Sequence, residues 1–407
     1  MSRFAECVAF CICYTVHPRR RISVSTPVSS PGKVSAAIRS RGAILKPLSR
    51  LAPAVPELRL EAAPPTQAVQ MPPARDLSEH PLELEQPWVQ TRFGWVSTWR
   101  AVKELFDASQ LVFPREVNHH NAKRVRFIFR ALRDFSLWRH WQGFLKSSPF
   151  GEVARHFARI YEKPFRPYLH KDLTRAECLR VLREHYLFLQ RHAPGALIEA
   201  MVRNKPFILN EHSVGELEEP LILNLTYARH MQQEGELTLS LGRSDSVDTL
   251  HDHRWITALT FVVQYGASGW EMLVGGIQGG HTEHSKEDMK LATHVFHGMR
   301  PKHLLLHLLR EIAASWGISR IYAISDDAHC YMRRRYRGRI TIKSSYAELW
   351  TDVGGRPAAN GFYSLPLGQG QRSLEDVPSR KRAQYRRRYA LLERMDAEVR
   401  GKLSIKP

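Results

Sequence analysis

A run of glycines is the first feature of the sequence that could form a ligand site. Gly275, Gly276, Gln278 and Gly279 follow a stretch that predicts a central strand. Glycine at such a place lets a ligand approach the backbone closely, or lets the strand bulge. The run is no P-loop, because no Gly-Lys-Ser/Thr follows, and no dinucleotide motif, because no helix is expected within the required spacing. We expect these four residues to contact a ligand.

Two cations lie where a long amphipathic helix is expected to begin, at Arg300 and Lys302 on either side of Pro301. Proline suits the first turn of a helix, where its missing N–H would be unpaired. Free backbone amides with Arg300 and Lys302 would bind a phosphate or carboxylate group. An ordinary helix start with hydrated cations has the same sequence, and that alternative stays open. His297 lies beside the pair and is the histidine that we expect to share its site.

Histidines on the same helix have a spacing that could hold a metal ion. His303, His307 and Glu311 recur at i, i+4 and i+8. The zinc-protease motif needs Glu beside the first histidine, and Leu304 occupies that position. The stripe borders the apolar face of the helix, so we interpret it as a polar flank and expect no metal site. No Ser-His-Asp or Cys-His set is recognisable, which leaves the catalytic residues unknown and enzymatic status uncertain.

Two clusters of arginine are candidates for binding anions. Arg333, Arg334 and Arg335 are interleaved with tyrosines, a composition that can stack on bases and follow phosphates. Arg386, Arg387 and Arg388 fall on a terminal basic helix, whose apolar face is formed by Tyr385, Tyr389, Leu392, Met395 and Val399. Such a helix could lie on an anionic membrane surface. We favour docking of its apolar face on the chain's own domain.

The totals constrain partners and compartment more than they constrain function. The formal net charge of +20 favours an anionic ligand or membrane surface as partner, with nucleic acid a weaker expectation. Five cysteines, three of them at positions 7, 11 and 13, do not form a secreted disulfide scaffold. No run approaches the ~20 apolar residues that cross a bilayer. We therefore expect a cytoplasmic protein, peripheral at the inner membrane if it binds lipid.

Three segments differ in composition and periodicity. Residues 1–90 contain 12 of the 24 prolines and predict a disordered basic leader, whose presence in the expressed protein the sequence leaves open. Residues 91–210 predict a helical lobe, in which Thr174 and Glu177 have the spacing of a capping box. Residues 211–400 predict an α/β domain with a basic C-terminal helix. Strands are expected at 221–227, 236–241, 255–265, 270–277, 321–324 and 362–365, and helices at 301–316, 346–353 and 379–399.

Five stretches in this order resemble the VirK/YbjX family of bacterial proteins, over roughly residues 95 to 395. They are Glu236-Leu-Thr-Leu239, Val274-Gly-Gly-Ile-Gln-Gly279, His297-Gly-Met-Arg-Pro-Lys302, Phe362-Tyr-Ser-Leu-Pro-Leu367 and the arginine-rich segment 379–392. The resemblance implies an intracellular, virulence-associated factor. Its expected role is in cell-envelope integrity, surface-protein display or resistance to antimicrobial peptides. The family has no agreed enzymatic activity.

The order strand, glycine-rich exit, helix, strand, helix, strand is similar to the core of N-acetyltransferase-like proteins. That resemblance implies a central mixed α/β (α+β) sheet flanked by helices, and acyl-CoA as a substrate whose pyrophosphate lies at the glycine turn and the next helix start. The sequence departs from the pattern, since about 20 residues separate Gly280 from Pro301. A non-catalytic binder of nucleic acid or of an anionic membrane surface is the competing hypothesis.

Overall fold

The computed structural model describes residues 95–213, 219–228, 230–243, 255–280, 284–333, 345–368 and 370–404. The predicted leader at 1–90 lies outside these ranges, as do Arg334 and Arg335.

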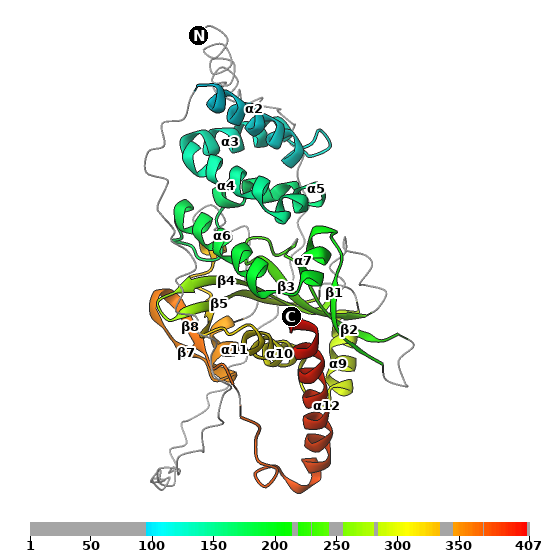
Figure 1. Ribbon diagram of the computed structural model, residues 1–407. Helices are drawn as coiled ribbons and strands as arrows, with labels where there is room; N and C mark the ends of the chain where they lie inside the picture. Colours follow the sequence, from blue (N-terminus) through cyan, green and yellow to red (C-terminus); the bar gives the residue numbers. More distant parts are fainter. Residues whose placement is uncertain are drawn as a thin grey trace, which may run out of the picture. The chain divides into compact units, whose positions relative to one another are not determined.

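The first described segment is helical (Figure 1). The rings of Phe127, Trp138 and Phe165 pack against one another at centroid distances of 5.9–6.4 Å, in an aromatic cluster that α2, α3, α4 and η2 share. The elements are α2 (Trp95–Val112), α3 (His120–Arg133), α4 (Phe135–Ser147), η1 (Pro149–Glu152), α5 (Val153–His156), η2 (Ala158–Phe165), α6 (Arg175–His192) and α7 (Gly195–Val202).

Helix α6 joins this segment to the sheet. The predicted capping box is confirmed at its start: Thr174 Oγ1 accepts from the Glu177 amide, and the Glu177 carboxylate accepts from the Thr174 amide at 2.8 Å. Leu182 and Tyr186 are fully buried in the same hydrophobic core as the strands. The helix therefore covers one face of the sheet, and the main core runs without interruption from helix to strands.

The strands form one eight-stranded mixed sheet in the order β1-β2-β3-β4-β5-β6-β8-β7. All neighbours are antiparallel except β5 and β6, which are parallel. The predicted fold class, a mixed sheet flanked by helices and preceded by a helical segment, is confirmed. The strands are β1 (Phe207–His212), β2 (Leu221–Tyr227), β3 (Leu237–Arg243), β4 (Trp255–Gly266), β5 (Gly269–Gly279), β6 (Arg320–Ile324), β7 (Arg356–Pro357) and β8 (Phe362–Leu365).

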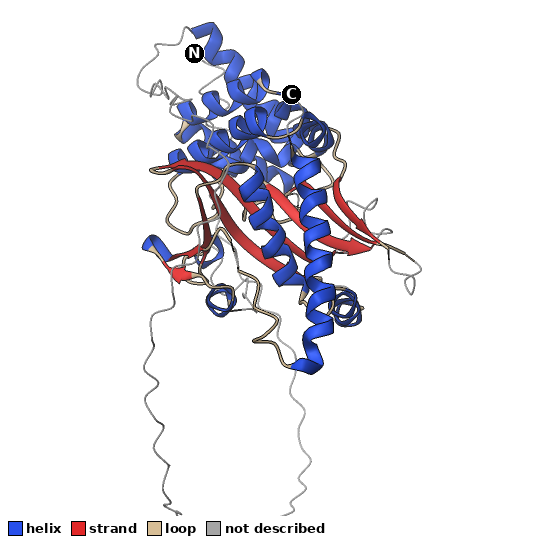
Figure 2. Cartoon of the chain, turned by 60° about the horizontal axis from the view of Figure 1, so that its bottom comes forward, coloured by secondary structure: helices blue, strands red, loops and turns tan. Residues whose placement is uncertain are grey.

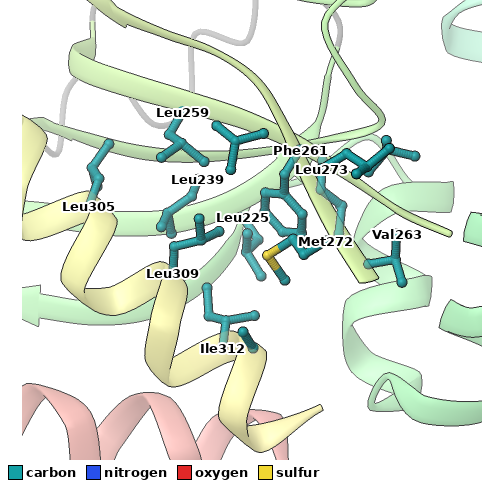
Figure 3. Close-up of a cluster of buried hydrophobic side chains, with 14 of the residues drawn as sticks. Leu225, Leu239, Leu259, Phe261, Val263, Met272, Leu273, Leu305, Leu309 and Ile312 are labelled. Carbon is teal, nitrogen blue, oxygen red and sulfur yellow. The ribbon is translucent and has the colours of Figure 1, made fainter. Parts of the chain in front are cut away.

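Parallel strands need a crossover, and here helices α9 (Ser285–Val295) and α10 (Pro301–Ser315) provide it. Helix α10 presents Leu305, Leu309 and Ile312, at i, i+4 and i+7, to the sheet (Figure 3). They pack beside buried side chains of β2, β3 and β4 that include Leu225, Leu239 and Leu259. The helix ends at Gly317, whose φ of +63° is left-handed. Helix α9 was not predicted, and it occupies the interval between Gly280 and Pro301.

Helix α12 (Ser379–Leu403) is long, and only its second half is buried (Figures 1 and 2). Leu392, Met395 and Val399 are buried against α10 and β1, which agrees with the docking that we favoured. Tyr385 and Tyr389 are only half-buried and pack edge to face on each other at 5.8 Å. Among the described helices, none combines the length and the apolar composition that a membrane crossing requires.

Candidate functional site

Strand β5 carries a bulge at Gly275. Its neighbour Gly276 pairs with Thr260 and Val274 pairs with Phe261, so Gly275 itself has no partner on β4. A β-carbon on Gly275 would overlap the backbone oxygen of Glu234, and one on Gly276 would overlap its carboxylate. Because these two residues are glycines, Glu234 can lie directly against the backbone of the strand.

Glu234 is the central ionisable group of the site. Its side chain is 1% exposed, and its carboxylate accepts from Gln278 Nε2 at 3.1 and 3.3 Å. Burial raises the pKa of Glu234 to about 8, against a smaller opposing effect of the Gln278 hydrogen bond. A carboxyl group with that pKa is protonated in most molecules at neutral pH, and it can exchange a proton close to neutrality.

His329 lies in the segment after β6, the parallel neighbour of β5, and contacts the bulge from there. Its Nε2–H donates to the backbone oxygen of Gly275 at 3.0 Å, while its Nδ1 accepts from the Tyr331 amide at 3.2 Å. These two bonds select one neutral tautomer. Burial lowers the pKa of His329 to about 4, so the ring is uncharged at physiological pH. Its Nε2 is 3.8 Å from the carboxylate of Glu234.

Tyr346 brings a phenol to the same side of Gly276 as the Glu234 carboxylate. Its hydroxyl is 3.2 Å from the position that a β-carbon on Gly276 would take. The residue opens α11 (Tyr346–Asp352), and the Asp326 carboxylate accepts from its amide at 2.9 and 3.0 Å. Burial, with the Glu234 carboxyl nearby, raises the pKa of Tyr346 above its usual value. The phenol therefore keeps its proton at neutral pH and can donate a hydrogen bond.

The backbone beside the bulge adopts an unusual conformation at Leu169. This buried leucine has φ +52°, in the left-handed region that a bulky residue rarely adopts. Its amide donates to the Gln233 carbonyl, and its own carbonyl accepts from the Cys330 amide. These two backbone hydrogen bonds hold Leu169 in the left-handed conformation. Its side chain lies over Gly275. Backbone strain of this kind is found preferentially at functional sites.

Cys330 lies next to His329 but is poorly suited to act as a nucleophile. Its thiol is fully buried and donates to the Gln233 carbonyl at 3.5 Å. Burial, followed by the nearby Glu234, raises the pKa of Cys330 well above its ordinary value. Because the thiolate is the reactive form, this sulfur is held in its unreactive state.

A second buried acid lies two residues from Glu234. Glu236 forms an ion pair with Lys163 at 2.5 Å, and both side chains are almost completely buried. Tyr168 donates to the same carboxylate at 2.9 Å, and Tyr186 of α6 donates to its other oxygen. This network joins η2 and α6 to the start of β3, and so fixes the position of the segment that carries Leu169.

The predicted ligand residues fall in two places. Gly275, Gly276 and Gln278 line the site, and Gly279 ends β5 close to it. Arg300 is the exposed N-cap of α10, and Lys302, two residues later in the first turn, is half-buried. Burial lowers the pKa of Lys302. Within the described residues, no hydrogen bond or ion pair joins either cation to the glycines, so their shared site stays a prediction.

His297 lies at the connection between α9 and α10. Its backbone is left-handed, with φ +51°, and its carbonyl accepts from Arg388 Nε and Nη2 at 3.1 and 2.7 Å. Burial, together with Arg387 and Arg388, lowers the pKa of His297. Of the two predicted arginine clusters, Arg333 ends a short helical turn (η3, Cys330–Met332), while Arg386 and Arg387 are exposed on α12.

The histidine stripe on α10 contacts acidic side chains. His307 Nε2 is 2.9 Å from a carboxylate oxygen of Asp396, and Glu311 pairs with Arg400 at 2.6 Å. His307, Glu311 and Asp396 offer atoms within 4.8 Å of one another, a spacing that a metal ion could occupy. Each of the three already has a polar partner on the facing helix, which is the arrangement of a polar flank.

The sequence analysis did not identify Glu234, His329 or Tyr346 as site residues. They come from three separate segments of the chain, and no local spacing relates them. The available signal was the glycine pair, because two adjacent glycines in a central strand predict that another group lies close to the backbone. The identity of that group depends on which segments pack there.

The chain is similar to proteins of two bacteria. It is 28% identical over 288 residues to the uncharacterised protein YbjX of Escherichia coli K12, which covers 70% of this chain and 85% of YbjX. Two uncharacterised proteins of Haemophilus influenzae are 26% identical over 181 residues and 32% identical over 129 residues. These matches cover 44% and 32% of this chain, and 57% and 43% of the two relatives.

No solved structure matches the chain. The predicted resemblance to the VirK/YbjX family is confirmed by the similarity to YbjX. The model of the family described as "Protein of unknown function (DUF535)" matches residues 116–401. The chain belongs to this family.

Proposed function

We propose that the site around Gly275 transfers an acyl group from an acyl-CoA thioester to an amine or hydroxyl acceptor. The observation that carries this proposal is the juxtaposition, at an unpaired bulge of β5, of a carboxyl with a pKa of about 8 and a phenol that keeps its proton. Acyl transfer needs one group to accept the acceptor's proton and another to supply a proton to the leaving sulfur.

The roles follow from the protonation states of the two side chains. In its ionised form, Glu234 accepts the proton of the acceptor as its nitrogen or oxygen bonds to the thioester carbonyl carbon. As the carbon–sulfur bond breaks, Tyr346 donates its proton to the leaving thiolate, and the proton taken up by Glu234 then restores the phenol. His329 acts as a positioning residue, because its Nε2 holds the Gly275 carbonyl and thereby the bulge.

The arrangement of the elements supports the proposal. β5, α10, β6, α11 and β8 follow one another in the order that resembles N-acetyltransferase-like proteins. Pro301 occupies the first helical position of α10, and Lys302 is half-buried without an ion pair to a described residue. Partial burial of an unpaired cation is unfavourable, and an anionic group such as a pyrophosphate would offset that cost. The departure from the pattern is helix α9, which lengthens the connection.

The cellular role that we propose follows the family resemblance. The protein would act on the cytoplasmic side, free or peripheral at the inner membrane, in cell-envelope integrity, surface-protein display or resistance to antimicrobial peptides. An acceptor in the envelope pathway would connect that role with acyl transfer.

Binding of the donor is the first test. Thermal unfolding of the full chain is followed with acetyl-CoA, CoA and a long-chain acyl-CoA, and thiol release is then measured with each donor that binds. We expect a rise in Tm, because a ligand that binds only the folded state stabilises it. Absence of a shift with all three compounds would overturn the proposal.

Two substitutions then test the assigned roles. Tyr346→Phe and Glu234→Gln keep the shapes of the side chains, so we expect the shift in Tm to persist. Each should lower donor-dependent thiol release by about 100-fold or more, the usual contribution of general acid–base catalysis. Gly143→Ala on α4, outside the site, is the control, since a β-carbon there meets no atom within 4 Å. Unchanged thiol release in both variants would reject the assigned residues.

A second candidate function is non-catalytic binding of an anionic macromolecule. It is supported by the net charge of +20 and by the exposed arginines of α12. Nucleic-acid binding should weaken steeply with salt, because phosphate contacts release counterions. Retention of the chain by neither DNA, RNA nor anionic liposomes at low salt would eliminate this candidate. A chain that ends before Ser379 tests whether α12 is responsible.

A further inference from the structure

The first half of α12 has an unusual distribution of charge. Residues 379–392 contain six Lys or Arg residues and no Asp or Glu. Three of these cations, Arg380, Lys381 and Arg382, lie in the first turn of the helix. The amino end of a helix carries a partial positive charge, so cations there are unfavourable by some tenths of a kcal/mol each. A local conflict of this kind is expected where a binding surface requires it.

This half of the helix also lies beyond the core. Arg380, Lys381, Arg386 and Arg387 are exposed, while the buried side chains of α12 begin at Leu391. In Figure 1 the red helix continues well past the strands toward its amino end. These four cations are therefore available to a partner, whereas Arg382 and Arg388 of the same half donate hydrogen bonds to backbone carbonyls of the chain.

A groove of about 630 Å³ runs between this half of α12 and helix α9. Its polar lining contains Lys290, His294, His297 and Arg387 and no carboxylate. Neither Lys290 nor Arg387 forms an ion pair or a side-chain hydrogen bond with another described residue. The rest of its lining consists of Met289, Leu291 and Val295, which form an apolar wall on α9, together with Thr293, Gly298 and Gln384.

The end of the groove is shaped by the α9–α10 connection. His297 and Gly298 both have positive φ, at +51° and +79°. Arg388 holds the His297 carbonyl through two hydrogen bonds, and a β-carbon on Gly298 would come within 2.6 Å of Gln384 Nε2. The turn is thus fixed against α12 by contacts within the chain, and Lys290 and Arg387 line the same groove beside it.

We propose that the groove between α9 and α12 binds the phosphate headgroup of an anionic phospholipid at a membrane surface. Lys290 and Arg387 would contact the phosphate, and the apolar wall would contact the lipid backbone. A free phosphate ion would make no use of that wall, and for this reason the lipid is favoured. The proposal deepens the anionic-surface candidate by naming its site and its ligand class. It is independent of acyl transfer at Gly275.

Vesicle flotation with the full chain tests the proposal. Vesicles of phosphatidylcholine alone are compared with vesicles that also contain phosphatidylglycerol, and inorganic phosphate serves as a competitor. We expect binding that requires phosphatidylglycerol. In Lys290→Glu/Arg387→Glu the affinity should fall at least about 30-fold, which corresponds to roughly 1 kcal/mol for each cation lost at an anionic surface.

The matched control is Arg380→Glu/Lys381→Glu, which makes the same charge change on exposed residues outside the groove. A smaller loss in this control than in the groove variant supports the site. Equal losses of vesicle affinity in the two variants would rule out the groove as the binding site. They would leave only a diffuse basic surface as the explanation of binding. No vesicle binding by the unaltered chain, or binding to duplex DNA alone, would reject the lipid. A rise in Tm with millimolar phosphate in the absence of vesicle binding would identify a soluble phosphate ligand and also reject the lipid.

Discussion

The carboxylate of Glu234 lies directly against the backbone of Gly276, at the place where a side chain on that strand residue would otherwise be. This contact exists because β5 bulges at Gly275 and because the segment that precedes β3 crosses over it. A buried acid, a neutral histidine and a phenol thereby meet at the end of the parallel strand pair.

Gly275→Ala should destabilise the protein. The new methyl group would meet the Glu234 backbone oxygen, which cannot move as a flexible side chain can. We expect a loss of about 1–3 kcal/mol in the free energy of unfolding, typical of overpacking in a tight site. Urea denaturation measures it. Gly279→Ala should change the value little, and equal effects at the two positions would contradict the close approach.

Glu234 should make stability fall as pH rises. Its pKa is about 8 in the folded chain against 4.5 for the ordinary group, so the folded state binds the extra proton. The contribution is complete below about pH 4.5 and is lost as pH rises through 8. The slope reaches at most about 1.4 kcal/mol per pH unit. Glu234→Gln, measured by urea denaturation at several pH values, should remove this decline. A wild-type profile that stays parallel to that of the variant would disprove it.

His329 should affect the stability of the protein at acidic pH. Its pKa is about 4 in the folded chain against 6.5 for the ordinary group, so the unfolded state binds the proton first. Stability is therefore complete above about pH 6.5 and falls as pH decreases through 4. His329→Leu should weaken this acid-dependent loss, as followed by the midpoint of acid unfolding. It should also lower stability at pH 7, where the Gly275 carbonyl loses its donor.

Removing one partner of the buried Lys163–Glu236 pair should be severe. Lys163→Met leaves a buried carboxylate whose remaining donors are Tyr168 and Tyr186, at an expected cost of about 3–5 kcal/mol. The double variant Lys163→Met/Glu236→Gln removes both charges and should recover part of that loss. A double-mutant cycle in urea measures the coupling. Strict additivity of the two single effects would show that the ion pair contributes nothing.

The regular elements were accessible from the sequence because their signals are local. The alternation from 221 to 227, the leucine spacing after Pro301 and the capping pair at Thr174 each depend on residues within a few positions. The structure confirms these elements. Strand β1 and helix α9 were missed, since β1 ends in polar residues and α9 has only two fully buried side chains. Their stability depends on packing against β2, α12 and β4.

The candidate site was accessible only in part. The two adjacent glycines predicted that another part of the chain or a ligand lies close to the backbone of β5. They did not predict which group that is. Glu234 lies 95 positions before His329, and His329 lies 17 before Tyr346. Each is a common residue type in an unremarkable local context. These residues meet because β5 bulges at Gly275 and because Leu169 and Cys330 are joined by a backbone hydrogen bond. The Asp326 carboxylate also accepts from the first amide of α11 and so positions Tyr346. Burial then determines the protonation states of these three side chains. The degree of burial depends on all the segments that pack around them, so no short stretch of sequence predicts it. The glycine pair and the helix pattern, in contrast, each depend only on residues close together in the sequence.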